Sequence, residues 1–156
     1  MRMKFIALAA VALLAACETA PKDAGTGANT GAASSSIRPG SQEDLAVNVG
    51  DRVFFGFDRF DLSPEARATL DRQGAWLQTY GSVTITVEGH SDERGTREYN
   101  LALGERRANS VKNYLAAKGI SPARVAVVSY GKEKPAVVGS TEAAWSQNRR
   151  GVTVVN

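Results

Sequence analysis

The sequence predicts an α+β domain over residues 51–156, in which a βαβαβ(β) order of elements forms a mixed sheet with helices packed on one face. Two observations indicate this fold class. Strand-like and helix-like patterns of apolar residues alternate along the stretch, an arrangement that covers a sheet with helices. The strand-like segments also alternate apolar with polar residues, so one face of the sheet is expected to be less buried than the other.

The first strand and the first helix are expected between residues 53 and 80. In the strand, Val53, Phe55 and Phe57 alternate and place three apolar side chains on one face. Ser63-Pro64 then supplies an N-cap and a proline in the first helical turn, two features that favour a helix start. The inward positions of this helix are Ala66, Leu70 and Leu77.

A second strand and a second helix follow between residues 83 and 119. Residues 83–87 alternate apolar with polar side chains, and the strand ends at Gly89, where the missing side chain permits close approach of another backbone. Apolar or small residues then recur at spacings of three and four, as on the inner face of a helix. They are Leu101, Gly104, Ala108, Val111 and Leu115.

The remaining residues are expected to complete the sheet. Residues 124–130 have the pattern of a third strand, and residues 151–155 that of a last one. Between them, residues 141–149 are expected to form a short helix that packs Trp145 onto the domain.

The N-terminal residues have the layout of a secretory signal peptide. Arg2 and Lys4 form a basic tip, and residues 5–16 carry no charge, a run shorter than the roughly 20 residues of a membrane span. Leu14-Ala15-Ala16 precedes Cys17, the only cysteine of the chain. This tetrapeptide resembles a bacterial lipobox, which implies cleavage of residues 1–16, a diacylglycerol on the Cys17 thiol and an acyl chain on its new amino group. The alternative is a secreted protein with one free thiol.

Residues 17–50 are expected to form a lipidated N-terminus and a flexible tether. Ala, Gly, Ser, Thr and Pro make up most of them and no aromatic residue occurs, so they cannot bury enough apolar surface to offset chain entropy. A flexible coil of this length spans roughly 30 Å. Residues 45–49 could instead pack onto the domain as a lead-in. Glu18 stands where lipoproteins retained at the inner membrane tend to carry aspartate, which favours the periplasmic face of the outer membrane.

Composition gives little support to a nucleic-acid-binding protein or to a metal-binding protein. The formal net charge is +3, but Arg2 and Lys4 belong to the predicted signal peptide, so nucleic acid is not an expected partner. The sequence has one His and one Cys, and that Cys is expected to carry lipid. No metal site is therefore predicted.

Side chains that can bind a ligand occur where the second strand passes into the second helix. Asp92 offers a carboxylate that only accepts hydrogen bonds, and Asn100 and Arg107 lie two helical turns apart on one face. Loops beyond strand ends are common binding rims in alternating layouts, so these side chains are expected to meet at one mouth. By residue types alone, a solvated loop held by surface ion pairs is the simpler interpretation.

Three motifs extend this pattern along the domain. They are Gly89-His90-Ser91-Asp92, Asn100-x-x-Leu103-Gly104-x-x-Arg107-Ala108-x-x-Val111-x-x-x-Leu115, and Asn148-Arg149-Arg150. Together they closely resemble the OmpA-like peptidoglycan-binding domain family. The resemblance implies non-covalent binding of the meso-diaminopimelate residue of the peptidoglycan stem peptide, with the ligand's ammonium group at Asp92 and its carboxylate at Arg107. It also implies that Asp58, Asn100 and Arg149 surround the pocket.

The resemblance carries expectations about partners as well. Lipid-anchored members of the family tether the outer membrane to the cell wall, act in cell division and engage the Tol system, so peptidoglycan, TolB and TolA are the expected partners. No cofactor is expected apart from the covalent lipid on Cys17. Replacing Asp92 or Arg107 by alanine is expected to abolish wall binding with little change in thermal stability.

One enzymatic alternative rests on two acidic residues. Glu88 and Asp92 could form the acid pair of a peptidoglycan hydrolase. They lie only four residues apart across a strand end, and no other feature supplies a nucleophile or a water-activating metal. A binding domain without enzymatic activity is therefore expected.

Overall fold

The computed structural model describes residues 37–156, so the predicted signal peptide, Cys17 and the tether up to residue 36 lie outside the described residues. The elements, in chain order, are α1 (Gln42–Asp44), the π-helical turn η1 (Leu45–Val49), β1 (Arg52–Phe54), α2 (Pro64–Thr79), β2 (Ile85–His90), α3 (Arg97–Ala117), the 3-10 turn η2 (Pro122–Arg124), β3 (Val125–Gly131), α4 (Glu142–Asn148) and β4 (Arg150–Val155). The predicted alternation of strands and helices, including the short helix before the last strand, is confirmed.

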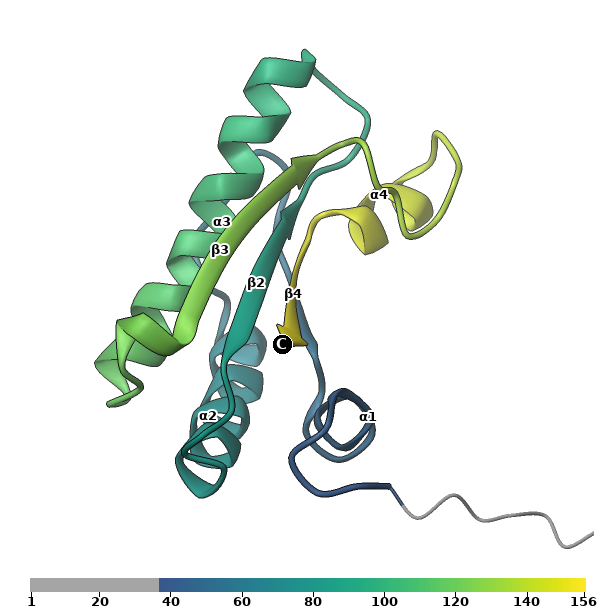
Figure 1. Ribbon diagram of the computed structural model, residues 1–156. Coiled ribbons are helices and arrows are strands. Elements are labelled where there is room, and N and C mark those ends of the chain that lie inside the picture. Colours follow the sequence, from purple (N-terminus) through teal and green to yellow (C-terminus); the bar gives the residue numbers. More distant parts are fainter. Residues whose placement is uncertain (1–36) are drawn as a thin grey trace, which may run out of the picture. The chain divides into compact units, whose positions relative to one another are not determined.

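Within residues 37–156, four strands form a mixed sheet in the order β1-β4-β2-β3 (Figure 1). β2 and β3 are parallel because α3 returns the chain to the same end of the sheet. β4 is antiparallel to both β1 and β2. Helices α2 and α3 share one core with the inward residues of the sheet, so the predicted α+β class with helices on one face is confirmed.

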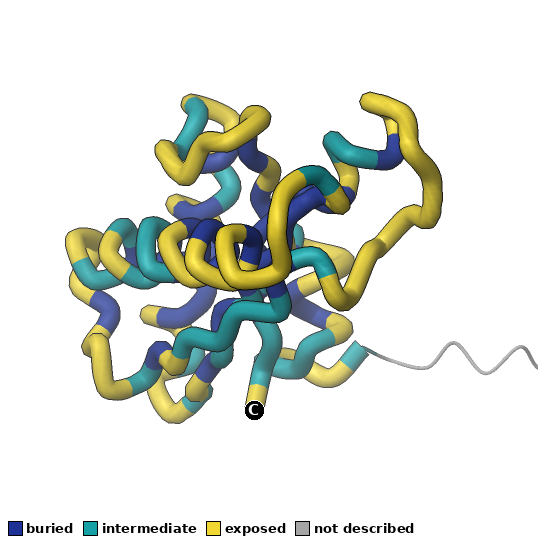
Figure 2. The backbone as a smooth tube through the Cα atoms, turned by 90° about the horizontal axis from the view of Figure 1, so that it is seen from above, coloured by how far each residue is buried: buried dark blue, intermediate teal, exposed yellow. Residues whose placement is uncertain are grey.

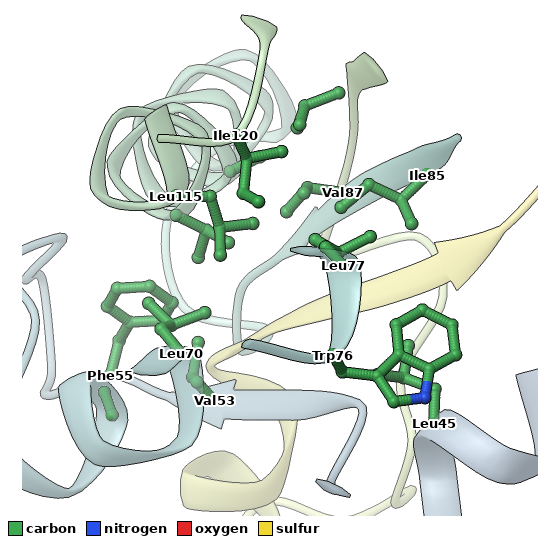
Figure 3. Close-up of a cluster of buried hydrophobic side chains, with 14 residues drawn as sticks. Leu45, Val53, Phe55, Leu70, Trp76, Leu77, Ile85, Val87, Leu115 and Ile120 are labelled. Atoms are coloured by element: carbon green, nitrogen blue, oxygen red, sulfur yellow. The ribbon is translucent and has the colours of Figure 1, made fainter. Parts of the chain in front are cut away.

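The core lies between these two helices and the sheet (Figure 3). Leu70 and Leu77 of α2, Leu115 of α3, and Ile85 and Val87 of β2 have no exposed surface. Buried residues occupy the inner turns of the helices and the strands, whereas exposed residues follow the outer turns and the loops (Figure 2). Burial of these branched side chains is the main favourable contribution to folding.

β1 is shorter than predicted, and Phe57 does not share its buried face. Val53 and Phe55 are buried, but the strand ends at Phe54 and the Phe57 side chain is 59% exposed. The chain turns away because Asp58 adopts a left-handed backbone conformation, with φ of 55°. The turn brings Phe57 and Asp58 to the start of α3 instead of extending the strand.

Residues 42–49 pack onto the domain as a lead-in, so the packed part of the chain begins ahead of Asp51. Leu45 is fully buried in the core. Asp44 accepts a hydrogen bond from Trp76 Nε1 at 2.9 Å. The Gln42 side chain also pairs with the backbone at the end of β4, where Oε1 accepts from Val155 N at 2.7 Å. This segment therefore replaces the edge pairing that the short β1 does not provide.

Two glycines bring the end of β2 against α3. A Cβ atom at Gly89 would lie 1.8 Å from the carbonyl oxygen of Gly104, so only glycine fits at this crossing. The predicted close approach at Gly89 is confirmed. It fixes where the loop after β2 leaves the sheet beside α3. No helix in the described part of the chain is long and apolar enough to cross a membrane.

Candidate functional site

A pocket of ≈ 210 Å³ opens between the end of β2, the first turns of α3 and the loop after β1. Asp58, Asp92, Asn100 and Arg107 line it, so the structure brings four of the five predicted site residues together. Arg149, the fifth, does not line the pocket but contacts Asp92 from the position between α4 and β4. Side chains that are far apart in sequence therefore meet at the mouth that the sequence indicated.

Asp92 lies two residues after the end of β2 and is only 4% exposed. Oδ1 accepts hydrogen bonds from the backbone N–H and from Nε of Arg94, at 3.2 and 3.3 Å. Oδ2 accepts from Arg94 Nη2 at 2.5 Å and from Arg149 Nη1 at 3.3 Å. Burial raises the pKa of the Asp92 carboxyl, but the bonds from Arg94 and Arg149 outweigh this effect and hold the pKa below its ordinary value. The carboxylate is therefore ionised at neutral pH.

Arg107 is completely buried and donates to three backbone carbonyl groups, two in the loop after β1 and one at the end of β2. Its Nε donates to the carbonyl oxygen of Arg59 at 2.8 Å, Nη1 to that of His90 at 2.8 Å, and Nη2 to that of Gly56 at 3.0 Å. A guanidinium has five N–H groups, so two are not used by these bonds. Burial lowers the pKa of Arg107 to about 10, partly offset by the charge of Asp92, and the side chain stays protonated at neutral pH.

Asp58 and Asn100 shape the rims of the pocket. The Tyr99 hydroxyl donates a hydrogen bond to Asp58 Oδ1, which ties the loop after β1 to the start of α3. Asn100 Nδ2 donates to the carbonyl oxygens of Arg94 and Thr96, at 2.8 and 3.1 Å. Because both amide hydrogens of Asn100 are engaged with the loop, its side chain has only the Oδ1 acceptor left for a ligand.

Arg149 is a buried positioning residue and not a surface cation. Its side chain is 7% exposed. Nε donates to the carbonyl oxygen of Phe55 at 3.0 Å, and Nη2 donates to Glu142 Oε1 at 2.5 Å. With Nη1 on Asp92, this side chain fixes the orientation of the pocket carboxylate from the C-terminal end of α4.

Arg94 is a pocket residue that the sequence analysis did not single out. Its Cζ lies 3.9 Å from the ring centroid of Phe57 and 4.0 Å from that of Trp145, so two aromatic rings contact the guanidinium. The one feature of the sequence that could have indicated Arg94 as a site residue is its position two residues after Asp92. The stacking on Phe57 and Trp145 depends on tertiary packing, which residue spacing does not reveal.

Glu88 and His90 lie outside the pocket. Glu88 does not line it, and its Oε2 is 3.5 Å from His90 Nε2. Gly89 between them packs against α3, so both neighbouring side chains point to the other face of the sheet. The two carboxylates of the enzymatic alternative, Glu88 and Asp92, are therefore not presented to the same cavity.

The pocket presents an anion and a cation that are not paired with each other. Among the described residues, the ion pairs of Asp92 are formed with Arg94 and Arg149, whereas Arg107 bonds to carbonyl oxygens. A planar guanidinium binds a carboxylate through parallel N–H groups, and a carboxylate binds an ammonium group. The arrangement suits a small zwitterion that carries an ammonium group and a carboxylate on one carbon atom.

Comparison with known proteins shows the family of the chain. The family model of the OmpA family matches residues 54–149. The chain is 52% identical over 154 residues to the peptidoglycan-associated lipoprotein of Rhizobium meliloti (strain 1021), an alignment that covers 96% of this chain and 85% of that protein.

Solved structures show the same fold. The crystal structure of the peptidoglycan-associated lipoprotein from Burkholderia pseudomallei aligns with a TM-score of 0.66 at 40% identity, over 68% of this chain and 90% of that one. The C-terminal domain of Helicobacter pylori MotB aligns with a TM-score of 0.63 at 20% identity, over 68% and 84% of the two chains, and this likeness concerns the fold alone. The chain belongs to the OmpA family.

Proposed function

We propose that this chain binds peptidoglycan non-covalently through the meso-diaminopimelate residue of the stem peptide. The observation that carries the proposal is the presence of the Asp92 carboxylate and the Arg107 guanidinium in one pocket of ≈ 210 Å³. The names of the R. meliloti and B. pseudomallei relatives, which associate those proteins with peptidoglycan, support it.

The chemistry of the head group explains the choice of residues. The unlinked end of diaminopimelate in a stem peptide carries an ammonium and a carboxylate on one carbon atom. Asp92 receives the ammonium, and the two N–H groups of Arg107 that do not bond to the backbone receive the carboxylate. Asp58 adds negative charge at the rim, Asn100 offers an acceptor, and Arg149 holds Asp92 in place.

Anchoring by lipid is part of the same proposal. Cys17, acylated on its thiol and its amino group, holds the chain at the periplasmic face of the outer membrane, because several acyl chains together anchor a protein stably. A tethered domain meets the cell wall at an effective concentration that reaches the millimolar range for short flexible linkers. A pocket of modest affinity therefore suffices to connect the outer membrane to the wall.

The Tol partners and the role in cell division stay predictions. TolB and TolA are expected from the family resemblance, and the described residues offer no feature that singles out a contact surface for either. A hydrolase is not proposed. Glu88 does not line the pocket, and Asp92 accepts hydrogen bonds from Arg94 and Arg149 at both oxygens, which leaves it poorly suited to activate water.

A titration with two muropeptides tests the proposal. The chain from residue 17 onward, with Cys17→Ser to keep it in solution, is titrated with a diaminopimelate muropeptide and with its lysine counterpart, which lacks the carboxylate next to the ammonium group. We expect the lysine form to bind at least roughly tenfold more weakly, because it cannot bond to Arg107.

Two variants locate the binding event. Asp92→Asn should abolish binding of the diaminopimelate muropeptide. Arg97→Gln is the matched control, because the Arg97 side chain is 73% exposed, pairs with Glu133 at 3.4 Å and does not line the pocket. Equal binding of both muropeptides, or unchanged binding by Asp92→Asn, would contradict the proposal.

A further inference from the structure

The Asp92 carboxylate has no acceptor site left for a new donor. A carboxylate offers about four lone-pair sites. In the structure Oδ1 accepts from the backbone N–H and Nε of Arg94, and Oδ2 accepts from Arg94 Nη2 and Arg149 Nη1. An ammonium group that binds to Asp92 must therefore take the place of one of these two arginine side chains.

Arg94 is the side chain that can leave. It is 31% exposed, whereas Arg149 is 7% exposed. Arg149 is held further by the carbonyl oxygen of Phe55 at 3.0 Å and by Glu142 at 2.5 Å. Displacing the Arg149 side chain would break three hydrogen bonds, two of them buried, while moving Arg94 exposes a cation that already contacts solvent.

A second carboxylate is within reach of Arg94. Glu142 Oε2 lies 3.9 Å from Arg94 Nη2, and the Glu142 side chain is 63% exposed. The rings of Phe57 and Trp145, at 3.9 and 4.0 Å from Arg94 Cζ, favour a cation at this position without fixing which carboxylate it pairs with. Glu142 therefore offers Arg94 a second carboxylate partner when it leaves Asp92.

We propose that Arg94 is an internal competitor for Asp92 and sets the selectivity of the pocket for zwitterions. This inference rests on the proposed function. An amine without a carboxylate replaces one cation by another at Asp92 and gains nothing elsewhere. A ligand that carries both groups also gains the bonds to Arg107, so only such a ligand displaces Arg94. The competition excludes simple amines and lysine side chains from a pocket that contains an aspartate.

Three small probes separate the two charges. Free meso-diaminopimelate carries both groups, pentane-1,5-diamine is the same carbon chain without the carboxylates, and heptanedioate is the same chain without the ammonium groups. Each is titrated calorimetrically into the Cys17→Ser chain described above, with Arg94 intact and with Arg94→Gln. Arg97→Gln is the control for loss of a positive charge nearby.

Loss of Arg94 should favour every ligand that carries an ammonium group. In Arg94→Gln we expect diaminopimelate to bind roughly tenfold more tightly, equivalent to about 1.4 kcal/mol. Pentane-1,5-diamine should gain measurable binding, and heptanedioate should bind no better than before. Arg94→Lys should give an intermediate affinity for diaminopimelate, because lysine keeps the charge but not the bidentate geometry. Arg97→Gln should leave all three affinities unchanged.

The result that overturns the inference is a diaminopimelate affinity that is unchanged or weaker in Arg94→Gln while Asp92→Asn still abolishes binding. Arg94 would then contribute to ligand binding directly or not at all. If Asp92→Asn leaves binding intact, the proposed function fails and the role of Arg94 fails with it. A nuclear magnetic resonance titration checks the movement itself. Hydrogen exchange of the Arg94 Nε–H should accelerate at saturating diaminopimelate, and an unchanged rate overturns the displacement.

Discussion

Asp92 and His90 lie two residues apart at the end of β2 and are both almost fully buried, but one side chain is ionised and the other is neutral. Asp92 accepts bonds from Arg94 and Arg149, which keep its pKa below the ordinary value. Neither ring nitrogen of His90 has a hydrogen-bond partner among the described residues. Burial, with the charges of Arg150 and Lys134, lowers the pKa of His90 to about 4, so the imidazole is neutral at pH 7.

The end of β2 therefore separates a charged site from a neutral one. A buried group that receives enough donors stays ionised and can serve a ligand, whereas a buried group without partners stays neutral. Arg107 connects the two regions, because it lines the pocket and donates to the His90 carbonyl oxygen at 2.8 Å. Changes at Arg107 should therefore have the largest effect on both.

Arg107→Ala is expected to lower the free energy of unfolding by about 3 kcal/mol, because it leaves three carbonyl oxygens without their donor, and the bond to the one of His90 is fully buried. Urea unfolding measures the loss. The sequence-based expectation of little change in thermal stability is therefore revised. Arg106→Ala is the control, since Arg106 is the exposed neighbour whose guanidinium lies over the Phe60 ring at 5.5 Å. Equal stability of the two variants would contradict the assigned role.

Acid should destabilise the neutral region through His90. The pKa of His90 in the folded protein, about 4, lies below the ordinary value of 6.5. Between pH 4 and 6.5, therefore, the imidazole is protonated in the unfolded chain but not in the folded one. The contribution of the neutral His90 to the free energy of unfolding is fully present above pH 6.5. It is lost as the pH falls to 4, and the loss is at most about 3 kcal/mol. The groups around the imidazole are Glu88, Arg150, Lys134 and Tyr130.

The difference between the original chain and His90→Gln isolates this contribution. Glutamine does not titrate, so urea unfolding at pH 4.5 and 7 should show a smaller loss of stability in the variant, while the carboxylates contribute equally to both. Parallel pH curves would mean that His90 reaches solvent and that the two sides of the strand end do not differ as described.

The contact between Gly89 and Gly104 is expected to contribute less to the free energy of unfolding than the buried Arg107 and His90. A Cβ at Gly104 would lie 2.3 Å from Ser129 Oγ and 2.8 Å from Gly89 O, so Gly104→Ala should cost about 2 kcal/mol. At Gly74 in α2 the nearest atom, Lys118 Cβ, is 3.6 Å away. Gly74→Ala should therefore stabilise the protein by up to about 1 kcal/mol, and chemical unfolding of the two variants should show opposite signs.

The sequence predicted the features that depend on local periodicity. The alternation of strands and helices, the approach at Gly89 and the shared helical face of Asn100 and Arg107 all follow from spacing. The position of Arg149 behind Asp92 could not follow from spacing, because β4 reaches β2 only through the sheet order.

Two further features depend on long-range packing. The left-handed turn at Asp58 carries no glycine as a signal. The stacking of Arg94 between Phe57 and Trp145 joins segments that only tertiary contacts bring together. The composition of the tether left open whether residues 45–49 pack onto the domain, and the burial of Leu45 in the core shows that they do.

The smallest effect is expected at Asp58, the second carboxylate of the pocket. Asparagine tolerates the left-handed conformation and keeps an acceptor for the Tyr99 hydroxyl, so Asp58→Asn should change stability by less than about 0.5 kcal/mol. Asp58 is exposed, and solvent screens its charge, so affinity for the diaminopimelate muropeptide should fall only roughly twofold. Asp92→Asn should abolish the same binding. If Asp58→Asn instead loses as much affinity, the ligand's ammonium group lies at the exposed rim, and the buried Asp92 serves to hold the loop.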